Sequence, residues 1–230
     1  MSCFSEEFLN NMLYSISAST HLKDVNTGKY VNSNLINSKV FGLSPAEIVG
    51  LTAWDLDSMM GDNWDRSFIS TVVEIEQEVI NRKTCGYHKQ AFLTISGKVR
   101  LQNMIKIPII GKKQKVQQIF TISENLITSL PLNQVWALYK KFYASNIKTG
   151  IKNFLLHTGV HQMFSELPTE SELAVILANA MHGQPGSKHV AKILNLSSRT
   201  IDTHIAHISN KLVQDKVFLF SGLKVNEANY

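Results

Sequence analysis

The stretch LSSRTIDTHIAHISNKL, residues 196–212, has the period of an α-helix with two different faces. At roughly 100° per residue, its large apolar side chains fall within one narrow sector, which comprises Ile201, Ile205, Ile208 and Leu212. The opposite side carries only polar or small residues, namely Arg199, Asp202, Thr203, Ala206, His207 and Asn210. Ser197 precedes the helical pattern and is a favoured N-cap residue. The stretch therefore predicts a helix that buries its isoleucines and presents the other face to a partner.

Two more short helices are predicted directly before this one. The first begins after Thr169, which forms a capping box with Glu172, and covers residues 170–182. The second covers KHVAKIL, residues 188–194, with Ser187 as its expected N-cap. Three helices with a tight turn between the last two describe a helix-turn-helix unit.

The charges around residues 188–211 favour a nucleic-acid partner. This segment has four basic residues against one aspartate, whereas the first 130 residues have 13 basic and 12 acidic residues. A merely solvated helix would more usually carry glutamate–lysine pairs four residues apart, and residues 197–212 contain none. Small side chains allow close approach to a duplex, and longer polar ones can reach base edges in the major groove. We therefore expect this helix to read DNA, with Arg199, Thr203 and His207 among the contacting residues.

The segments PTESEL and KHVAKILNLSSRTIDTHIAHISNKL resemble the DNA-binding domain of LuxR-type regulators over about residues 164–222. The matching positions include Lys188, Val190, Ala191, Leu194, Ser197, Thr200, Ile201, His204, Lys211 and Leu212. The resemblance implies that Lys188, Thr200 and Lys211 contact phosphates. It also implies that Asp202, Thr203, Ala206 and His207 face bases.

The chain departs from the LuxR pattern at several of these positions. Thr169 replaces the usual arginine and His189 the usual glutamate, so an internal salt bridge common in the family lacks its usual residues. Asp202 and Ala206 replace lysines of some members, which lowers electrostatic affinity for DNA, although an aspartate can accept a hydrogen bond from cytosine. His204 has two equal interpretations, a packed histidine with one hydrogen bond or a phosphate contact.

The first 128 residues predict a different kind of domain. HLKDVNTGKYVNSN, residues 21–34, reads as a hairpin, and residues 64–81 read as a long amphipathic helix. Three strands then follow over residues 89–96, 98–110 and 116–128. An antiparallel sheet with helices on one face is expected, so the whole chain is predicted to be α+β.

Several phrases of this region resemble PAS sensor domains over about residues 10–128. They are KDVNTGKYVNSN, GLSPAEIVGLTAWDL and ENLIT. The resemblance implies a small molecule or a protein ligand between sheet and helices. A helix over residues 6–16 begins this part of the chain, and its apolar face is expected to pack on the PAS-like domain or on a partner copy.

No cofactor is predicted for the PAS-like region, although an unidentified small ligand remains open. Haem-binding members usually take a histidine from the long helix, and residues 64–81 contain none. Photoactive flavin members carry a reactive cysteine in an Asn-Cys-Arg-like motif, which neither Cys3 nor Cys85 has. Cys85 and His88, placed together on a turn, are too few for a metal site, so none is expected. Cofactor-binding residues stay unassigned.

Residues 129–163 are expected to form a helical linker with an aromatic face. This face comprises Leu132, Val135, Trp136, Tyr139, Phe142 and Tyr143. Two interpretations stay open, a linker packed on either domain or a signalling and dimerising helix. The predicted division is a sensor domain over 1–128, this linker, and a DNA-binding domain over 164–230.

The sequence thus predicts a transcription regulator that binds double-stranded DNA as a homodimer, with its sensor domain controlling the helix-turn-helix. The alternative is a protein–protein interaction regulator whose DNA-binding fold has weakened DNA affinity. An enzyme is not expected, because no phosphate-binding glycine loop, zinc signature or nucleophile elbow is present. Two cysteines, no apolar run of roughly 20 residues and no signal-peptide pattern predict a cytoplasmic protein without a membrane partner.

Overall fold

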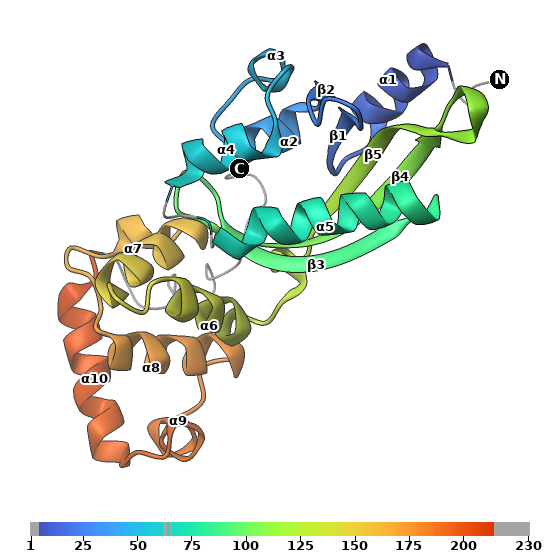
Figure 1. The fold of residues 1–230 in the computed structure, drawn as a ribbon. Coiled ribbons are helices and arrows are strands. Elements are labelled where there is room, and N and C mark those ends of the chain that lie inside the picture. Colours follow the sequence, from blue (N-terminus) through green and yellow to red (C-terminus); the bar gives the residue numbers. More distant parts are fainter. Residues whose placement is uncertain (1–4, 62–63, 65, 214–230) are drawn as a thin grey trace. The chain divides into compact units, whose positions relative to one another are not determined.

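The computed structural model describes residues 5–61, 64 and 66–213, which fall into two compact units that divide between Leu126 and Ile127. Unit 1 combines an antiparallel sheet with helices, and the described part of unit 2 is built from helices (Figure 1). The α+β class is therefore confirmed. Residues 214–230 of the expected DNA-binding domain lie outside the described residues.

The sheet of unit 1 has five antiparallel strands in the order β2-β1-β5-β4-β3. Their bounds are β1 Ser19–Asp24, β2 Tyr30–Ser33, β3 Gly86–Leu93, β4 Val99–Ile110 and β5 Val116–Asn125. The turn of the predicted β1–β2 hairpin uses Gly28 at φ 69°, a conformation that side chains disfavour. The pairing of β1 with β5 places the first strand inside the sheet, beside the last strand, which is the central one.

Helices α2 to α5 cover the face of the sheet on which His21 and Lys106 lie. Their bounds are α2 Leu35–Val40, α3 Pro45–Ile48, α4 Ala53–Met60 and α5 Arg66–Arg82. Ser44 and Glu47 form a capping box at the start of α3. The apolar core beneath these helices includes Val40, Ala53, Trp64, Phe68, Ile69, Val72, Phe92 and Met104.

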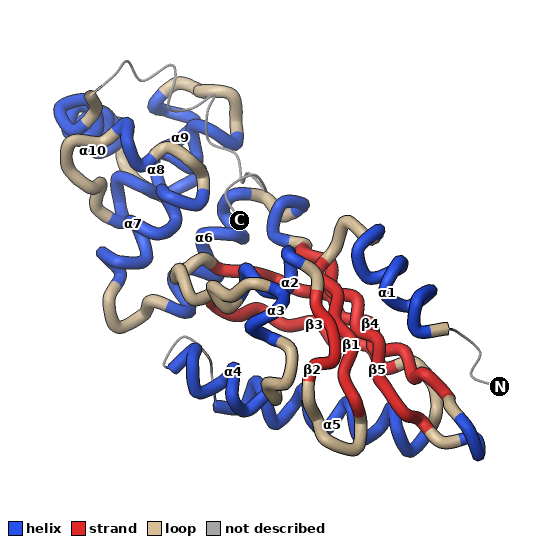
Figure 2. The backbone as a smooth tube through the Cα atoms, turned by 90° about the horizontal axis from the view of Figure 1, so that it is seen from above, coloured by secondary structure: helices blue, strands red, loops and turns tan. Residues whose placement is uncertain are grey.

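Helix α1, Glu6–Ser15, packs on the opposite face of the sheet, as Figure 2 shows. Leu9 and Leu13 are buried against Leu22, Ile109 and Phe120. Because side chains alternate between the two faces of a strand, Leu22 lies on the other side from its neighbours in β1. Helices thus cover both faces of the sheet, and the prediction of helices on a single face was wrong. The apolar face of α1 was expected to pack on the PAS-like domain or on a partner copy, and it packs on the sheet of its own domain.

Unit 2 contains the expected aromatic linker and the helix-turn-helix. Its elements are η3 Ile127–Ser129, α6 Leu132–Phe142, α7 Ile147–His157, η4 His161–Met163, α8 Glu170–Met181, α9 Ser187–Leu194 and α10 Ser198–Lys211. Trp136 and Tyr139 of α6 are buried, with ring centroids 5.4 and 5.7 Å from that of Phe154 in α7. The Tyr139 hydroxyl lies 2.7 Å from Nδ1 of His157. The aromatic face thus packs inside unit 2.

No helix among residues 5–61 and 66–213 is long and apolar enough to cross a membrane.

Candidate DNA interface and sensor cavity

Helix α10 has the two faces that its sequence predicts. Ile201 and Ile208 are buried, while Ile205 and Leu212 are half-buried beside them. All six residues of the opposite side are exposed: Arg199, Asp202, Thr203, Ala206, His207 and Asn210. Since two isoleucines anchor the helix, its polar face is open to a partner without any rearrangement of unit 2.

The start of α10 is fixed by short-range hydrogen bonds. The Ser197 side chain accepts from the Thr200 backbone N–H at 3.0 Å, so Ser197 is the N-cap as predicted. The two hydroxyls of Ser197 and Thr200 also lie 2.8 Å apart. Asn195 ends α9 in the left-handed conformation at φ 54°, which permits the tight connection between the two helices. Thr200 thus takes part in the cap, and its phosphate contact stays a prediction.

Ser187 has a different role from the predicted N-cap. Gly186 is the N-cap of α9 and makes no side-chain hydrogen bond, while Ser187 is the first helical residue. The Ser187 hydroxyl donates to Oδ1 of Asp202 in α10 at 2.5 Å. Asp202, which is predicted to face bases, is therefore exposed but held toward the start of α9.

An ion pair joins α8 to the C-terminal end of α10. Nζ of Lys211 lies 2.8 Å from Oε2 of Glu172, and the Lys211 side chain is only 16% exposed. Burial would raise the pKa of Glu172, but hydrogen bonds from Lys211 and the Thr169 N–H lower it. The capping box of Thr169 and Glu172 is confirmed. The chain therefore has an internal salt bridge although two usual family residues are replaced, and Lys211 faces this pair rather than the open face of α10.

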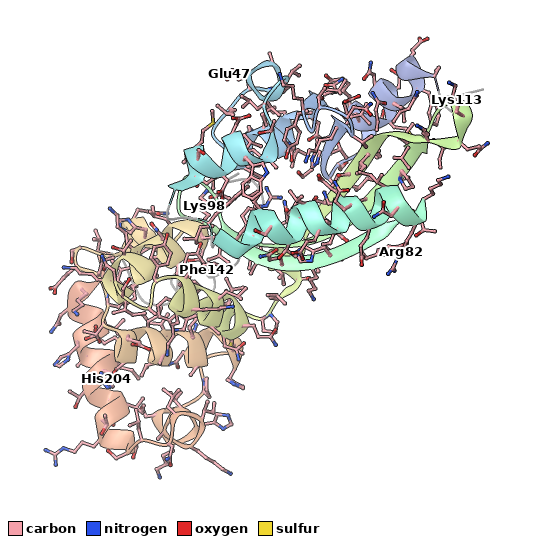
Figure 3. All side chains as sticks on the ribbon, viewed as in Figure 1. Glu47, Arg82, Lys98, Lys113, Phe142 and His204 are labelled. Carbon is pink, nitrogen blue, oxygen red and sulfur yellow. The ribbon has the colours of Figure 1, made fainter. Side chains whose placement is uncertain are left out.

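The remaining predicted residues lie on accessible surfaces of α9 and α10. Lys188 and Lys192 are exposed on α9. His207 is exposed, with Nδ1 3.7 Å from Oε1 of Glu172. His204 lies half-buried on α10 (Figure 3), and its Nδ1 has no hydrogen-bond partner among the described residues. Neither interpretation of His204 is decided by this arrangement.

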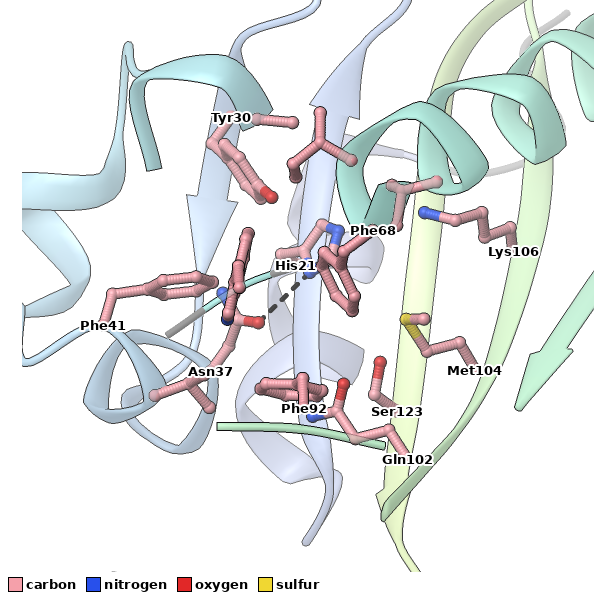
Figure 4. Close-up of a pocket in the computed structure, with 15 residues that line it drawn as sticks. His21, Tyr30, Asn37, Phe41, Phe68, Phe92, Gln102, Met104, Lys106 and Ser123 are labelled. Atoms are coloured by element: carbon pink, nitrogen blue, oxygen red, sulfur yellow. Dashed lines mark hydrogen bonds between the residues drawn. The ribbon is translucent and has the colours of Figure 1, made fainter. Parts of the chain in front are cut away.

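Unit 1 encloses a cavity of about 40 Å³ between the sheet and its helices (Figure 4). The helix side of the cavity is mostly apolar, with Asn37 of α2 as a polar group, and its apolar residues include Val40, Phe41, Ala53, Phe68, Ile69 and Val72. The strand side is mostly polar and includes His21, Gln102, Lys106 and Ser123. A mostly apolar pocket with a few placed polar groups is the usual form of a small-molecule site.

Two buried lysines share one glutamate behind this polar wall. Nζ of Lys23 and Nζ of Lys106 lie 2.7 and 2.8 Å from the two carboxylate oxygens of Glu76. Burial would raise the pKa of Glu76, but the two ammonium groups lower it to about 2. Burial and the same two lysines lower the pKa of His21 to about 3, so His21 is neutral at pH 7.

Sequence reasoning did not find the polar wall of the cavity. A signal was present for Lys106 alone, because it interrupts a strand that is otherwise rich in apolar residues, whereas His21 and Ser123 lie in strands that contain many other polar residues. At a period of two, each belongs to one face of its strand, but only the pairing of β1, β4 and β5 shows that the three faces coincide.

The pair Cys85 and His88 does not lie on a turn as predicted. His88 is part of β3, and its Nε2 lies 2.5 Å from Oε1 of Gln90. Cys85 is exposed. Within the described part of the chain, no three His, Cys, Asp or Glu side chains cluster as metal ligands would.

Residues 169–217 match the model of the luxR family of bacterial regulatory proteins. This match and the two faces of α10 identify the C-terminal part of the chain as a LuxR-family helix-turn-helix domain. No curated protein matches the sequence.

Several solved structures are similar to this chain. The Vibrio cholerae protein VqmA in complex with ligand and DNA is 15% identical over 95% of this chain and 86% of its own, with a TM-score of 0.43. A phage VqmA–DPO complex is 18% identical over 93% and 84%, with a TM-score of 0.42. The PAS domain of Bordetella pertussis BvgS is 16% identical over 52% and 84%, with a TM-score of 0.43. Because these TM-scores lie below 0.5, the fold is assigned from the strand order and the family match, and not from these structures.

Proposed function

We propose that this chain is a transcription regulator in which α10 reads a DNA duplex and the PAS-like unit 1 receives the controlling signal. The observation that supports DNA reading is the complete exposure of the polar face of α10 within a LuxR-family domain. Arg199, Thr203 and His207 are the proposed base-reading residues, and all three are exposed. Arg199 and His207 are long enough to reach base edges in a major groove, and Thr203 is small enough to allow close approach.

The phosphate contacts of the proposed interface come from α9 rather than from the end of α10. Lys188 and Lys192 are exposed on α9 and free of ion pairs among the described residues. Lys211 is a weaker candidate than these two lysines, because its ammonium group already pairs with Glu172. Phosphate contacts fix the position of a protein on DNA, and base contacts specify the sequence.

The proposed regulator acts as a homodimer, since a helix-turn-helix reads two half-sites about one helical turn apart when two copies are present. It performs no chemical step and works in the cytoplasm, where its DNA is accessible. Its signal is a small ligand of unit 1 rather than haem or a photoactive flavin. In support, the histidine of the cavity comes from β1 and not from α5, and the volume of about 40 Å³ is small.

The test replaces Arg199 or Thr203 by alanine and measures binding to a selected DNA site by fluorescence anisotropy. Each substitution should weaken specific binding by about 1 to 3 kcal/mol, which is the usual value of one good base contact. Asn153→Ala, in α7 and away from α9 and α10, is the control and should leave DNA affinity unchanged. Raising the salt concentration should weaken binding of the unmodified chain steeply, because bound phosphates release counterions.

A protein–protein regulator is the second candidate, and one feature favours it. Asp202 places a carboxylate on the reading face, where it opposes the negative duplex. If neither substitution changes DNA affinity but both abolish capture of a partner protein, the second candidate replaces the first. A DNA affinity that does not depend on salt would also contradict DNA reading.

A further inference from the structure

The polar wall of the unit 1 cavity has hydrogen-bonding capacity that its own residues do not use. Lys106 is 1% exposed, and its ammonium group makes one hydrogen bond among the described residues, to Glu76. An ammonium group has three donors, so two remain. Gln102 and Ser123, 5% and 2% exposed, line the same cavity beside Lys106. A few polar groups placed in a mostly apolar pocket are what orients a small ligand.

The charge beside the cavity is also unbalanced. Lys23 and Lys106 share the single carboxylate of Glu76, which leaves one positive charge in excess in this buried cluster. Lys23 has a second stabilising contact, because its Nζ lies 5.3 Å from the centre of the Tyr30 ring. Lys106 has no comparable contact within the described residues, and it is the one of the two lysines that lines the cavity. The missing counter-charge therefore belongs on the cavity side of Lys106.

The cavity is small and has one apolar side. A volume of about 40 Å³ accommodates about three water-sized groups, since each needs roughly 10 to 15 Å³ measured in this way. Phe41, Phe68 and Val72 oppose the polar wall. A fitting molecule thus has one anionic end and a short apolar remainder.

We propose that the ligand of this cavity is a small monocarboxylate, with its anionic group on Lys106 and its apolar part against Phe68 and Val72. The inference rests on the proposed function only in naming the signal for unit 1. A bound carboxylate supplies the counter-charge that Glu76 alone does not provide. A cavity of this size admits acids of two or three carbons, and a longer acid requires displacement of the aromatic side chains.

The test compares acids with their uncharged isosteres on the full chain. Melting temperature is measured with sodium acetate or propionate, with acetamide or propionamide, and with sodium chloride at equal ionic strength. At about ten times its Kd, an acid should raise the melting temperature by about 3 to 6 °C above the chloride control. The matching amide should raise it less, because it cannot neutralise the ammonium group.

The variant Lys106→Met removes the charge and leaves Glu76 paired with Lys23, and it should lose the response to the acid. Lys89→Met, an exposed position on β3, is the matched control and should keep the response. If Lys106→Met does not fold, the comparison of acid and amide on the unmodified chain decides alone. Equal stabilisation by both, no acid effect beyond chloride, or an unchanged response of Lys106→Met would overturn the proposal.

These measurements contain no DNA, so the two proposals can fail separately. A chain that responds to the acid but binds no DNA supports the carboxylate site and contradicts the regulator. A chain that binds DNA specifically but does not respond to the acid supports the regulator and contradicts the carboxylate site.

Discussion

His21 is a histidine that folding keeps neutral. It is 7% exposed, its Nδ1 lies 3.3 Å from Oδ1 of Asn37, and its ring meets that of Tyr30 edge to face with centroids 4.8 Å apart. Burial and the positive charges of Lys106 and Lys23 lower its pKa to about 3. In the unfolded chain the pKa returns to roughly 6.5. Between these two values the unfolded state binds more protons than the folded state.

Stability should consequently rise with pH across this window and fall as the solution is acidified. For His21 alone, the free energy of unfolding should decrease by up to about 1.4 kcal/mol for each pH unit between about 6 and 4. The measurement is urea unfolding of the full chain at several pH values, with His21→Gln as the reference that lacks this proton. Parallel pH profiles for the two proteins would show that His21 is not held neutral.

At the scale of single residues, the sequence predicted what depends on near neighbours. The caps Thr169 and Ser197 were predicted correctly, because each accepts a hydrogen bond from a backbone N–H three residues ahead. Ser187 was not, because its partner Asp202 lies 15 residues away, across the helix-turn-helix. The DNA contacts predicted for exposed residues such as Arg199 remain predictions.

Strand β3 begins at Gly86, whose backbone lies close against side chains of helix α5. A Cβ atom at this position would lie 2.6 Å from Cγ2 of Val79 and 3.0 Å from Cγ2 of Ile75. Val79 is 1% exposed, so it cannot move aside into solvent. Interiors are close-packed, and an added carbon forces side chains or backbone to shift. Gly86 therefore sets the distance between the helix and the first strand after it.

Gly86→Ala should destabilise unit 1 by about 1 to 3 kcal/mol, as overpacking usually does. Denaturant unfolding measures this loss. Val79→Ala removes the nearer obstacle, so the double variant should be less destabilised than the sum of the two single variants. Strictly additive effects would mean that the glycine is not needed for this approach.

At the scale of elements, periodicity identified α5, α10 and the strands, since side-chain position within an element follows from its own repeat. It could not show which face of the sheet α1 covers. That choice depends on Leu22, Ile109 and Phe120 meeting on one face, and these residues come from three strands.

The boundary between the two units does not coincide with the boundary of the helix-turn-helix. Helices α6 and α7 both contact α8, and Nζ of Lys140 lies 2.6 Å from Oε1 of Glu170. The Val213 backbone N–H also donates to the Met163 carbonyl at 2.9 Å. The segment expected to be a linker thus contributes buried residues to unit 2, including Val135, Ile151, Phe154 and Leu155.

A fragment of residues 127–230 should therefore unfold cooperatively in denaturant, and so should the fragment 1–126, because each retains its own buried core. A fragment of residues 164–230, which corresponds to the sequence-based division, should be several kcal/mol less stable than 127–230, because it leaves the apolar face of α8 uncovered. Circular dichroism during urea unfolding measures both. Equal stability of the two C-terminal fragments would show that α6 and α7 add nothing to this core.

The sequence by itself determined the α+β class, the helix-turn-helix, the N-caps Thr169 and Ser197, and the two faces of α10. These features depend on interactions within about four residues or on the repeat of a single element. Only the tertiary structure decided the buried cluster of Lys23, Glu76 and Lys106, the polar wall of the cavity, and the internal role of Lys211. The residues of that cluster lie 53 and 30 positions apart, and those of the Lys211 pair 39 apart. Strand pairing and helix packing bring such groups together, and no local pattern specifies which distant charges will meet.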